Sequence, residues 1–228
     1  VLHHVSFEVQ EGKVLGILGR TGSGKTTLAR LLFRLYDTQE GEVSLGGSSV
    51  KAVTLRNLRQ RIGMVTQDVQ LFNAPVRDNL TFFNRAIDDM HLLQVIDLVG
   101  LSSWYHTLPD GLNSMLGTDS QRLSAGEAQL LAFARVFLKD PGLVIFDEAS
   151  SRLDPATERL IERAVSSVLE NRTGIVIAHR LETIQRADTI LILEDGRISE
   201  YGAREALAGN PNSRFAGLLR AGLEEAHA

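Results

Sequence analysis

The stretch Gly19-Arg20-Thr21-Gly22-Ser23-Gly24-Lys25-Thr26 decides the fold of this chain. It matches the pattern G-x-x-x-x-G-K-[ST], follows an apolar run at 14–18 and precedes a segment with helical spacing. Strand, glycine turn and helix in this order are the context in which the motif holds phosphates. The alternative is a glycine-rich turn without a ligand, which the completeness of the motif in its proper context disfavours. The sequence therefore predicts a nucleoside triphosphate site.

The chemistry of this loop follows from its residue types. Glycines let successive backbone N–H groups point into one concavity, and the start of the next helix adds partial positive charge there. The Lys25 ammonium can reach the β- and γ-phosphates, and the Thr26 hydroxyl can bind Mg²⁺. The predicted nucleotide-binding residues are Gly19, Arg20, Thr21, Gly22, Ser23, Gly24, Lys25, Thr26 and Thr27.

Composition narrows the class of protein. The chain has 228 residues with 24 basic and 28 acidic side chains, and its net charge of −4 gives no electrostatic footprint for nucleic acid. It has no cysteine, which excludes disulfides and cysteine nucleophiles. No apolar stretch approaches the ~20 residues of a membrane span, and no signal peptide is visible. The opening Val1-Leu2 reads as mid-strand, so we interpret the chain as a domain of a longer polypeptide.

Hydrophobic spacing predicts how the elements alternate. Strands are expected at 1–9, 14–18, 62–66, 143–146, 175–178 and 189–193. Helices are expected at 25–35, 55–61, 124–138 and 155–169, with helical spacing over 76–107 and two short helices at the end of the chain. Turns at Gly46-Gly47 and at 194–197 predict hairpins. Strands that alternate with helices indicate an α/β core with parallel strands.

Two acids follow the apolar run Leu143–Phe146. Asp147 at the end of this strand can hold Mg²⁺, and Glu148 can orient or deprotonate a water for attack on the γ-phosphate. A pair of acids after a strand is more often a solvated loop. The phosphate loop elsewhere in the chain favours the catalytic interpretation.

The residues Leu123-Ser124-Ala125-Gly126-Glu127 resemble the LSGGQ signature of the ABC ATPases, with Ala125 and Glu127 as departures. Ser124 is a plausible N-cap with Glu127 at the third helical position, as in a capping box. Its hydroxyl, the backbone N–H groups and the helix dipole suit an anion. The plainer interpretation is a capped helix and nothing more. In the family this anion is the γ-phosphate of ATP held by an opposing subunit.

Further elements of the same family follow in order along the whole chain. Gln67 is similar to the Q-loop glutamine, Ser151 and Asp154 lie in a stretch like the D-loop, and His179 is similar to the switch histidine. A lone glutamine or histidine after a strand is more often structural, so only the complete set points to function. The resemblance implies catalytic Glu148, His179 and Gln67, and Mg²⁺ ligands Thr26, Gln67 and Asp147. It implies Ser151 and Asp154 at a dimer interface in which two ATP molecules lie between two domains.

This resemblance implies an α/β fold. A P-loop NTPase core with a mainly parallel sheet would span 1–75 and 140–228, together with an antiparallel β subdomain. A helical subdomain that carries the signature would be inserted at about 76–139.

A subfamily is indicated by Val65–Phe72 and Val76–Leu80, which are similar to the VPQD-x-x-LF-x-x-TVRENL stretch of ABC exporters. In exporters this region receives the transmembrane domain, so the implied partners are a transmembrane domain bound through Gln67–Leu80 and a second ABC ATPase domain, identical or related. We expect Leu71, Phe72 and Val76 to form an exposed apolar docking site, or alternatively to belong to the core. The implied location is the cytoplasmic face of a membrane.

The sequence departs from the family pattern at several positions, and two other functions compete with the exporter. Met115 stands where exporters carry an acidic residue, Glu127 replaces the signature glutamine, and the aromatic that stacks on adenine would lie upstream of Val1. A soluble ABC ATPase in DNA repair or translation would carry long insertions or tandem cassettes. A P-loop kinase would need neither Ser124 nor His179. The transported substrate is not encoded in these motifs.

Overall fold

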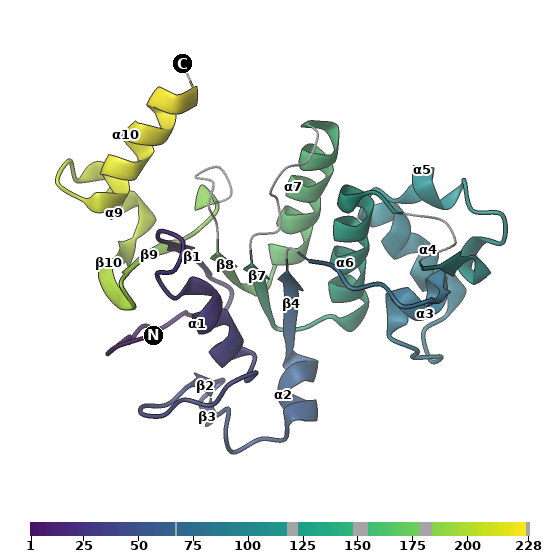
Figure 1. Cartoon of the computed structure of the whole chain (residues 1–228), viewed down its shortest axis with the longest axis horizontal. Helices are drawn as coiled ribbons and strands as arrows, with labels where there is room; N and C mark the ends of the chain where they lie inside the picture. Colours follow the sequence, from purple (N-terminus) through teal and green to yellow (C-terminus); the bar gives the residue numbers. More distant parts are fainter. Residues whose placement is uncertain (67, 118–122, 148–154, 178–183, 227–228) are drawn as a thin grey trace. The chain divides into compact units, whose positions relative to one another are not determined.

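The chain divides into two compact units (Figure 1). The computed structural model describes residues 1–66, 68–117, 123–147, 155–177 and 184–226. The first unit comprises Val1–Met64, Gly142–Glu148 and Asn171–Ala228, and the second comprises Val65–Pro141 and Ala149–Glu170. Residues 76–139, for which the sequence predicts a helical subdomain, all belong to the second unit.

A six-stranded sheet in the order β10-β9-β1-β8-β7-β4 forms the centre of the first unit. The strands are β10 (Arg197–Ala203), β9 (Thr189–Glu194), β1 (Val14–Leu18), β8 (Thr173–Ile177), β7 (Leu143–Asp147) and β4 (Ile62–Thr66). β1 runs parallel to both β8 and β9, and β7 runs parallel to β8. At one edge of the sheet, β9 and β10 form an antiparallel hairpin. The predicted α/β class with a mainly parallel sheet is confirmed.

The central strands are buried along their whole length, which explains their unbroken apolar sequences. Every residue of β1 and β7 is buried, and Leu15, Ile17 and Ile145 have no exposed surface. Parallel strands covered on both faces select such continuous runs over alternating ones.

The sheet is accompanied by helices and one further hairpin. They are α1 (Lys25–Leu32), α2 (Leu55–Arg61), α9 (Arg204–Gly209), α10 (Arg214–Ala226) and the hairpin of β2 (Ser44–Leu45) and β3 (Ser48–Ser49). Helix α1 ends three residues before the predicted Leu35, because Arg34 takes a left-handed conformation with φ 51°. The N–H group of Arg34 then donates to the Leu31 carbonyl and closes the helix.

The predicted first strand at 1–9 is wrong. This segment has no strand in the structure, although Val5, Phe7 and Val9 are half-buried and pack on the core. Its alternation therefore reflects one face lying on the core rather than ladder pairing. His4 also has a left-handed backbone with φ 53°, which interrupts an extended course.

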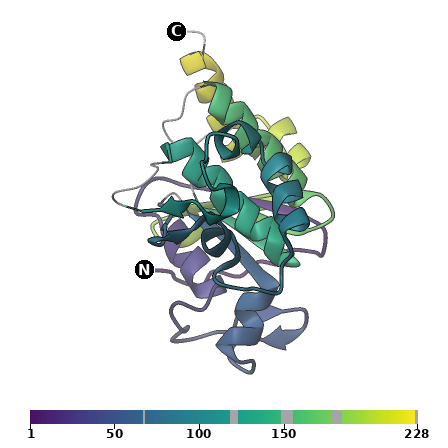
Figure 2. The ribbon, with the colours of Figure 1, turned by 90° about the vertical axis from the view of Figure 1, so that its right-hand side faces the viewer.

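Helices make up most of the second unit, and Figure 2 gives a view onto them. They are α3 (Val76–Thr81), α4 (Asp89–Leu98), α5 (Ser102–Tyr105), the 3₁₀ turn η1 (Gly111–Asn113), α6 (Ala125–Lys139) and α7 (Pro155–Leu169). A short antiparallel pair, β5 (Ala74–Pro75) and β6 (Met115–Leu116), accompanies them. Helix α6 contacts α3, α4 and α7, so it is the centre of this unit.

Candidate nucleotide site and signature helix

The glycine loop between β1 and α1 has a backbone that side chains would not permit. Gly19 has φ 152°, and a Cβ there would overlap the Leu193 carbonyl oxygen and lie 2.6 Å from the Ser23 hydroxyl oxygen. Gly24 has φ 106° and serves as the N-cap of α1 without any side-chain hydrogen bond. The start of α1 thus leaves capping to something other than a neighbouring side chain.

A buried lysine occupies the first position of α1. Lys25 is 4% exposed, and its ammonium donates to the carbonyls of Gly19 at 2.6 Å and Arg20 at 3.1 Å. A cation is rarely buried unless an anion or several acceptors meet it. Ser23 is also buried, and within the described parts of the chain its hydroxyl oxygen has no hydrogen-bond partner. Both side chains fit a loop that receives an anionic ligand.

The glycine loop is also in contact with the hairpin of β9 and β10. The turn between β9 and β10 brings the Gly196 N–H group to the Ser23 carbonyl at 3.1 Å, while the Gly196 carbonyl accepts from the His3 N–H group at 2.8 Å. Together with the close approach of Leu193 to Gly19, these bonds hold the loop in one conformation. The sequence analysis missed this support, because nothing in the hairpin turn names its partner.

The other predicted nucleotide-binding residues follow the course of the loop. Arg20, Thr21 and Gly22 are exposed, whereas Thr26 and Thr27 are half-buried on the first turn of α1. Thr26, which carries a hydroxyl, directly follows the buried Lys25 in sequence. This is the order that the motif requires for a cation ligand next to a phosphate contact.

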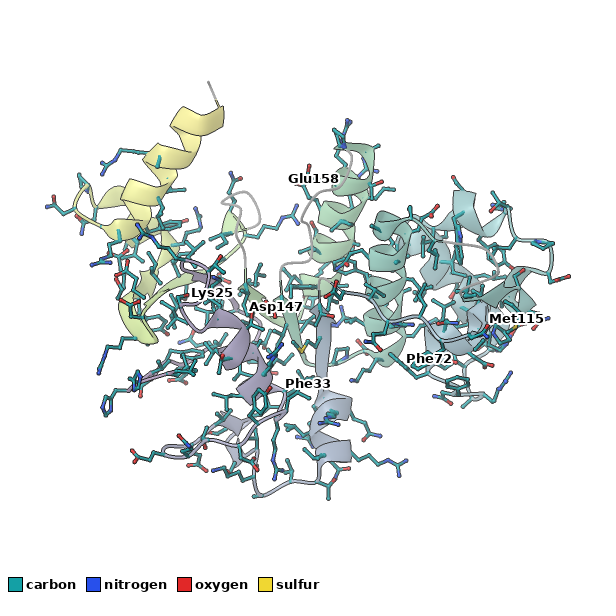
Figure 3. All side chains as sticks on the ribbon, viewed as in Figure 1. Lys25, Phe33, Phe72, Met115, Asp147 and Glu158 are labelled. Atoms are coloured by element: carbon teal, nitrogen blue, oxygen red, sulfur yellow. The ribbon has the colours of Figure 1, made fainter. Side chains whose placement is uncertain are left out.

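Asp147 is a buried carboxylate at the carboxyl end of β7. It is 8% exposed and pairs in register with Ile177 at the end of β8. Helix α1 contacts β7, and Figure 3 labels Lys25 and Asp147 in this part of the first unit. Ligands of open α/β sheets bind beyond the carboxyl ends of the strands. A hard cation such as Mg²⁺ fits a site that offers this carboxylate and a threonine hydroxyl.

Five predicted site residues lie outside the described residues: Gln67, Glu148, Ser151, Asp154 and His179. Three of these residues, Gln67, Glu148 and His179, follow the end of a described strand within one or two positions in sequence. β4 ends at Thr66, β7 at Asp147, and β8 at Ile177, two residues before His179. Because β7 and β8 are parallel neighbours, their ends lie at one edge of the sheet. The functional roles of all five residues remain predictions.

The signature residues form the start of α6, and the predicted capping box is present. Ser124 is the N-cap, its hydroxyl accepts from the Glu127 N–H group at 3.2 Å, and the Glu127 carboxylate accepts from the Ser124 N–H group at 2.8 Å. Leu123 is half-buried and Ala125 is exposed, whereas Gly126 is buried. The departure at position 125 is thus tolerated because its methyl group lies on the surface.

The expected docking site is only partly exposed. Phe72 is 38% exposed and Leu71 is half-buried, but Val76 has no exposed surface. The expectation that Val76 is exposed is therefore wrong, and the alternative that it belongs to the core holds. Its N–H group donates to the Ser114 carbonyl at 2.9 Å, which places the start of α3 inside the second unit.

Two phenylalanines that the sequence analysis missed extend this apolar surface. Phe82 and Phe83 are both more than half exposed, and their rings lie 5.9 Å and 5.5 Å from that of Phe72, edge to face. Met115 is 44% exposed and pairs with Pro75 through β6 and β5 (Figure 3). We call Phe72, Phe82, Phe83 and Met115 the aromatic patch. The adjacent pair Phe82-Phe83, directly after α3, was the available signal.

Arg135 joins the patch to α6. Its guanidinium donates to the carbonyls of Asn79 at 2.7 Å and Gln70 at 2.9 Å, and lies 4.8 Å from the centre of the Phe82 ring. Burial lowers the pKa of Arg135 to about 10. A lone cation in the apolar run of α6 was a signal for such a role, because a buried charge needs partners.

Known proteins have sequences similar to that of this chain. The family model described as ABC transporter matches residues 2–151. The mitochondrial iron-sulfur clusters transporter ABCB7 of Homo sapiens is 41% identical over 215 residues, which cover 94% of this chain and 29% of the relative. ABC transporter B family member 6 of Dictyostelium discoideum is 44% identical over 207 residues, 91% of this chain and 30% of the relative.

A solved structure of a bacterial Atm1-family ABC exporter with ATP bound superimposes with a TM-score of 0.86 at 37% identity. It covers 96% of this chain, which in turn covers 38% of that protein. The chain thus spans about a third of the length of the proteins that it matches. Among the helices of the described residues, none combines the length and apolar character needed to cross a bilayer.

The glycine loop with its buried lysine, the carboxylate at the end of β7 and the capped signature helix agree with the family match and the structural likeness. The chain belongs to the ABC transporter family and is an ATP-binding domain of the exporter type.

Proposed function

We propose that this chain binds ATP with Mg²⁺ and hydrolyses it to drive an exporter. The observation that carries the proposal is Lys25, a buried ammonium at the start of α1 that meets the carbonyls of its own glycine loop. An anionic ligand in this loop would be attracted by the positive charge of the Lys25 ammonium. The backbone N–H groups at the start of α1, which no side chain caps, would donate to its oxygens.

The hydrolytic residues follow from this placement. Thr26, Asp147 and Gln67 would hold the Mg²⁺, which when bound neutralises charge on the β- and γ-phosphates. Glu148 would orient or deprotonate the attacking water from the position next to Asp147. His179 would contact the γ-phosphate and hold Glu148 and the water in place. The burial of Asp147 at the carboxyl edge of the sheet supports this assignment.

We further propose that each ATP lies between two domains. The start of α6, with Leu123, Ser124, Ala125, Gly126 and Glu127, would meet the ATP held by the glycine loop of a second domain. Ser151 and Asp154 would line the same interface. ATP would then drive dimerisation, and hydrolysis would drive separation. The exposure of Ser124 and Ala125 supports access by a partner.

The second partner in this proposal is a transmembrane domain. It would dock on the region Gln67–Leu80 from the cytoplasmic side of a membrane, with the aromatic patch as the apolar contact. The exposed rings of Phe82 and Phe83, which lie edge to face against Phe72, support the proposal, since such clusters mark interaction sites more often than single residues do. The relatives' names, which describe transporters and exporters, support it independently.

Mixing two inactive variants tests the shared site. Ser124→Arg places bulk at the signature, and Lys25→Ala removes the phosphate contact, so each chain alone should hydrolyse little ATP. A dimer of one chain of each kind contains one site with neither defect and one site with both. Phosphate release should therefore reappear on mixing, and the specific activity of the unaltered chain should rise with its concentration.

Other results would contradict the shared site or the assignment as an ATPase. A specific activity independent of concentration, together with no recovery on mixing, would show that one chain completes its own site. ADP formation that requires an added small-molecule acceptor, with the phosphate transferred to that acceptor and not released, would favour the kinase. A Ser124→Arg chain that still binds ATP as a monomer is the control for folding.

A further inference from the structure

The first turn of α6 lies directly against the first turn of α7. A Cβ atom on Gly126 would overlap the Cγ2 methyl of Thr157, and would also lie 3.2 Å from its Cβ and 3.4 Å from its hydroxyl oxygen. Gly126 is buried, and its two helical neighbours are not. The missing side chain at position 126 therefore faces this chain's own α7 and not the surface.

This contact separates the two central positions of the signature. Ala125 carries its methyl group on the exposed side of α6. One residue further, the helix backbone has turned toward α7, and Thr157 occupies the space beside the Cα atom of Gly126. Helices that approach this closely need a small residue at the crossing point.

The geometry points to Thr157 as a positioning residue for the signature. By filling the space beside Gly126, it fixes the start of α6 to the start of α7. Because α7 begins immediately after Asp154 in sequence, the signature and the predicted interface residues before α7 are tied to one packed helix pair. The inference rests on the proposed function, in which both stretches meet the same partner.

Helix α7 is also closely packed against a segment other than α6. A Cβ on Gly100, in the turn after α4, would lie 2.9 Å from a methyl group of Leu160 on α7. Ile161, Ala164 and Val165 of α7 are buried. These neighbours restrict the movement of α7, so α7 cannot easily shift away from a methyl group added at position 126.

The test is a set of compensating substitutions in the 228-residue chain. Gly126→Ala adds the methyl group, Thr157→Ser removes only the methyl group that it would overlap, and Thr157→Val keeps that bulk without the hydroxyl. We expect Gly126→Ala to lower ATP hydrolysis about tenfold or more and to lower the unfolding midpoint. Gly126→Ala with Thr157→Ser should recover most of both losses, and Gly126→Ala with Thr157→Val should recover neither.

Four outcomes overturn the inference. Equal impairment in the serine and valine double variants would mean that the methyl group acts elsewhere, such as against the partner's nucleotide. Recovery of the unfolding midpoint without any effect on hydrolysis would reduce Thr157 to a packing residue. Unchanged hydrolysis in Gly126→Ala would do the same. If Gly126→Ala does not fold, selective recovery of folded and active protein by Thr157→Ser still supports the inference, and failure of both double variants overturns it.

A failure of the proposed function gives a different pattern. Ser124→Arg would then leave hydrolysis unchanged, although the unfolding midpoints of the Gly126 and Thr157 variants still report the packing. Exposed Gln94 on α4 provides the control, because Gln94→Ala in the same unit should change neither measurement.

Discussion

The starts of α1 and α6 are both proposed to meet a phosphate, yet they satisfy their first backbone N–H groups differently. Helix α1 begins after a left-handed glycine, has no side-chain cap and places a buried ammonium at its first position. Helix α6 begins at Ser124, whose hydroxyl and N–H group are already paired with Glu127. Helix α1 is thus prepared for a ligand, whereas α6 is stable without one.

The N-terminus of a helix thus serves two different purposes in this chain: ligand binding at α1 and helix stability at α6. At α1, the chain gives up local stability and keeps its donors for binding. At α6, capping stabilises the helix, and any phosphate must compete with the serine hydroxyl for the Glu127 N–H group. Substitutions at α1 should therefore change binding, and substitutions at α6 should change stability and assembly.

The largest effect is expected at α1. Lys25→Ala should weaken ATP binding by the single chain roughly 10- to 100-fold, because a hydrogen bond to a charged group contributes about 1.5–3 kcal/mol. Titration with a fluorescent ATP analogue measures the affinity. Arg30→Ala, an exposed cation in the last turn of the same helix, is the matched control and should bind as the unaltered chain does. Equal affinities in both variants would contradict a phosphate site at α1.

At α6 we expect a smaller effect, and one on stability. Ser124→Ala removes the N-cap, which should cost about 1 kcal/mol and lower the unfolding midpoint by about 2–4 °C. Ser124→Asp keeps a good N-cap, so its midpoint should stay near that of the unaltered chain. Its added negative charge should nevertheless suppress hydrolysis if a phosphate of the partner lies there. Full activity of Ser124→Asp would show that the start of α6 only caps a helix.

The smallest effect concerns the departure at position 127. Glu127→Gln keeps the capping box, since glutamine also serves at this position, but removes a negative charge near the proposed partner phosphate. ATP-dependent dimerisation in a Glu148→Gln background should become about two- to fivefold tighter at low salt, with the difference shrinking as salt is added. Sedimentation at two salt concentrations measures it. A difference that is absent at low salt would place the phosphate away from Glu127.

Local patterns predicted the regular elements well. Helices α2 and α7 and strand β4 have the predicted bounds, because their apolar spacing and end residues are encoded locally. The capping box at Ser124 was predicted for the same reason, since its two partners are three residues apart. The glycine loop was predicted from one motif, and its structure has the buried lysine and glycine conformations that the motif requires.

Features that depend on distant contacts could not be predicted. Val1–Val9 alternates like a strand, but only its packing on the core explains the pattern. Val76 is buried because α3 packs against η1 and α6, and nothing in its immediate neighbours indicates this. Phe82 and Phe83 are exposed because both have left-handed backbones at the end of α3. The partner of Gly126 lies 31 positions further along the chain, on another helix.

The pairing of β1 has a consequence for how the chain is made. Both neighbours of this strand, β8 and β9, come from the last third of the sequence. A ribosome that adds about 5–20 residues per second needs roughly 10–35 s to pass from Leu18 to Glu194. Until β8 is complete at Ile177, which is most of this interval, the strand that leads into the nucleotide loop has neither of its partners.

The apolar residues Val14–Leu18 therefore have no neighbouring strand to pair with for most of synthesis. Unpaired apolar strands of this kind are the segments on which chaperones act and from which aggregation starts. The part of the chain that the family model matches, residues 2–151, contains neither β8 nor β9. A nascent chain stalled at that length would display the complete glycine loop sequence but have no sheet on which to build it.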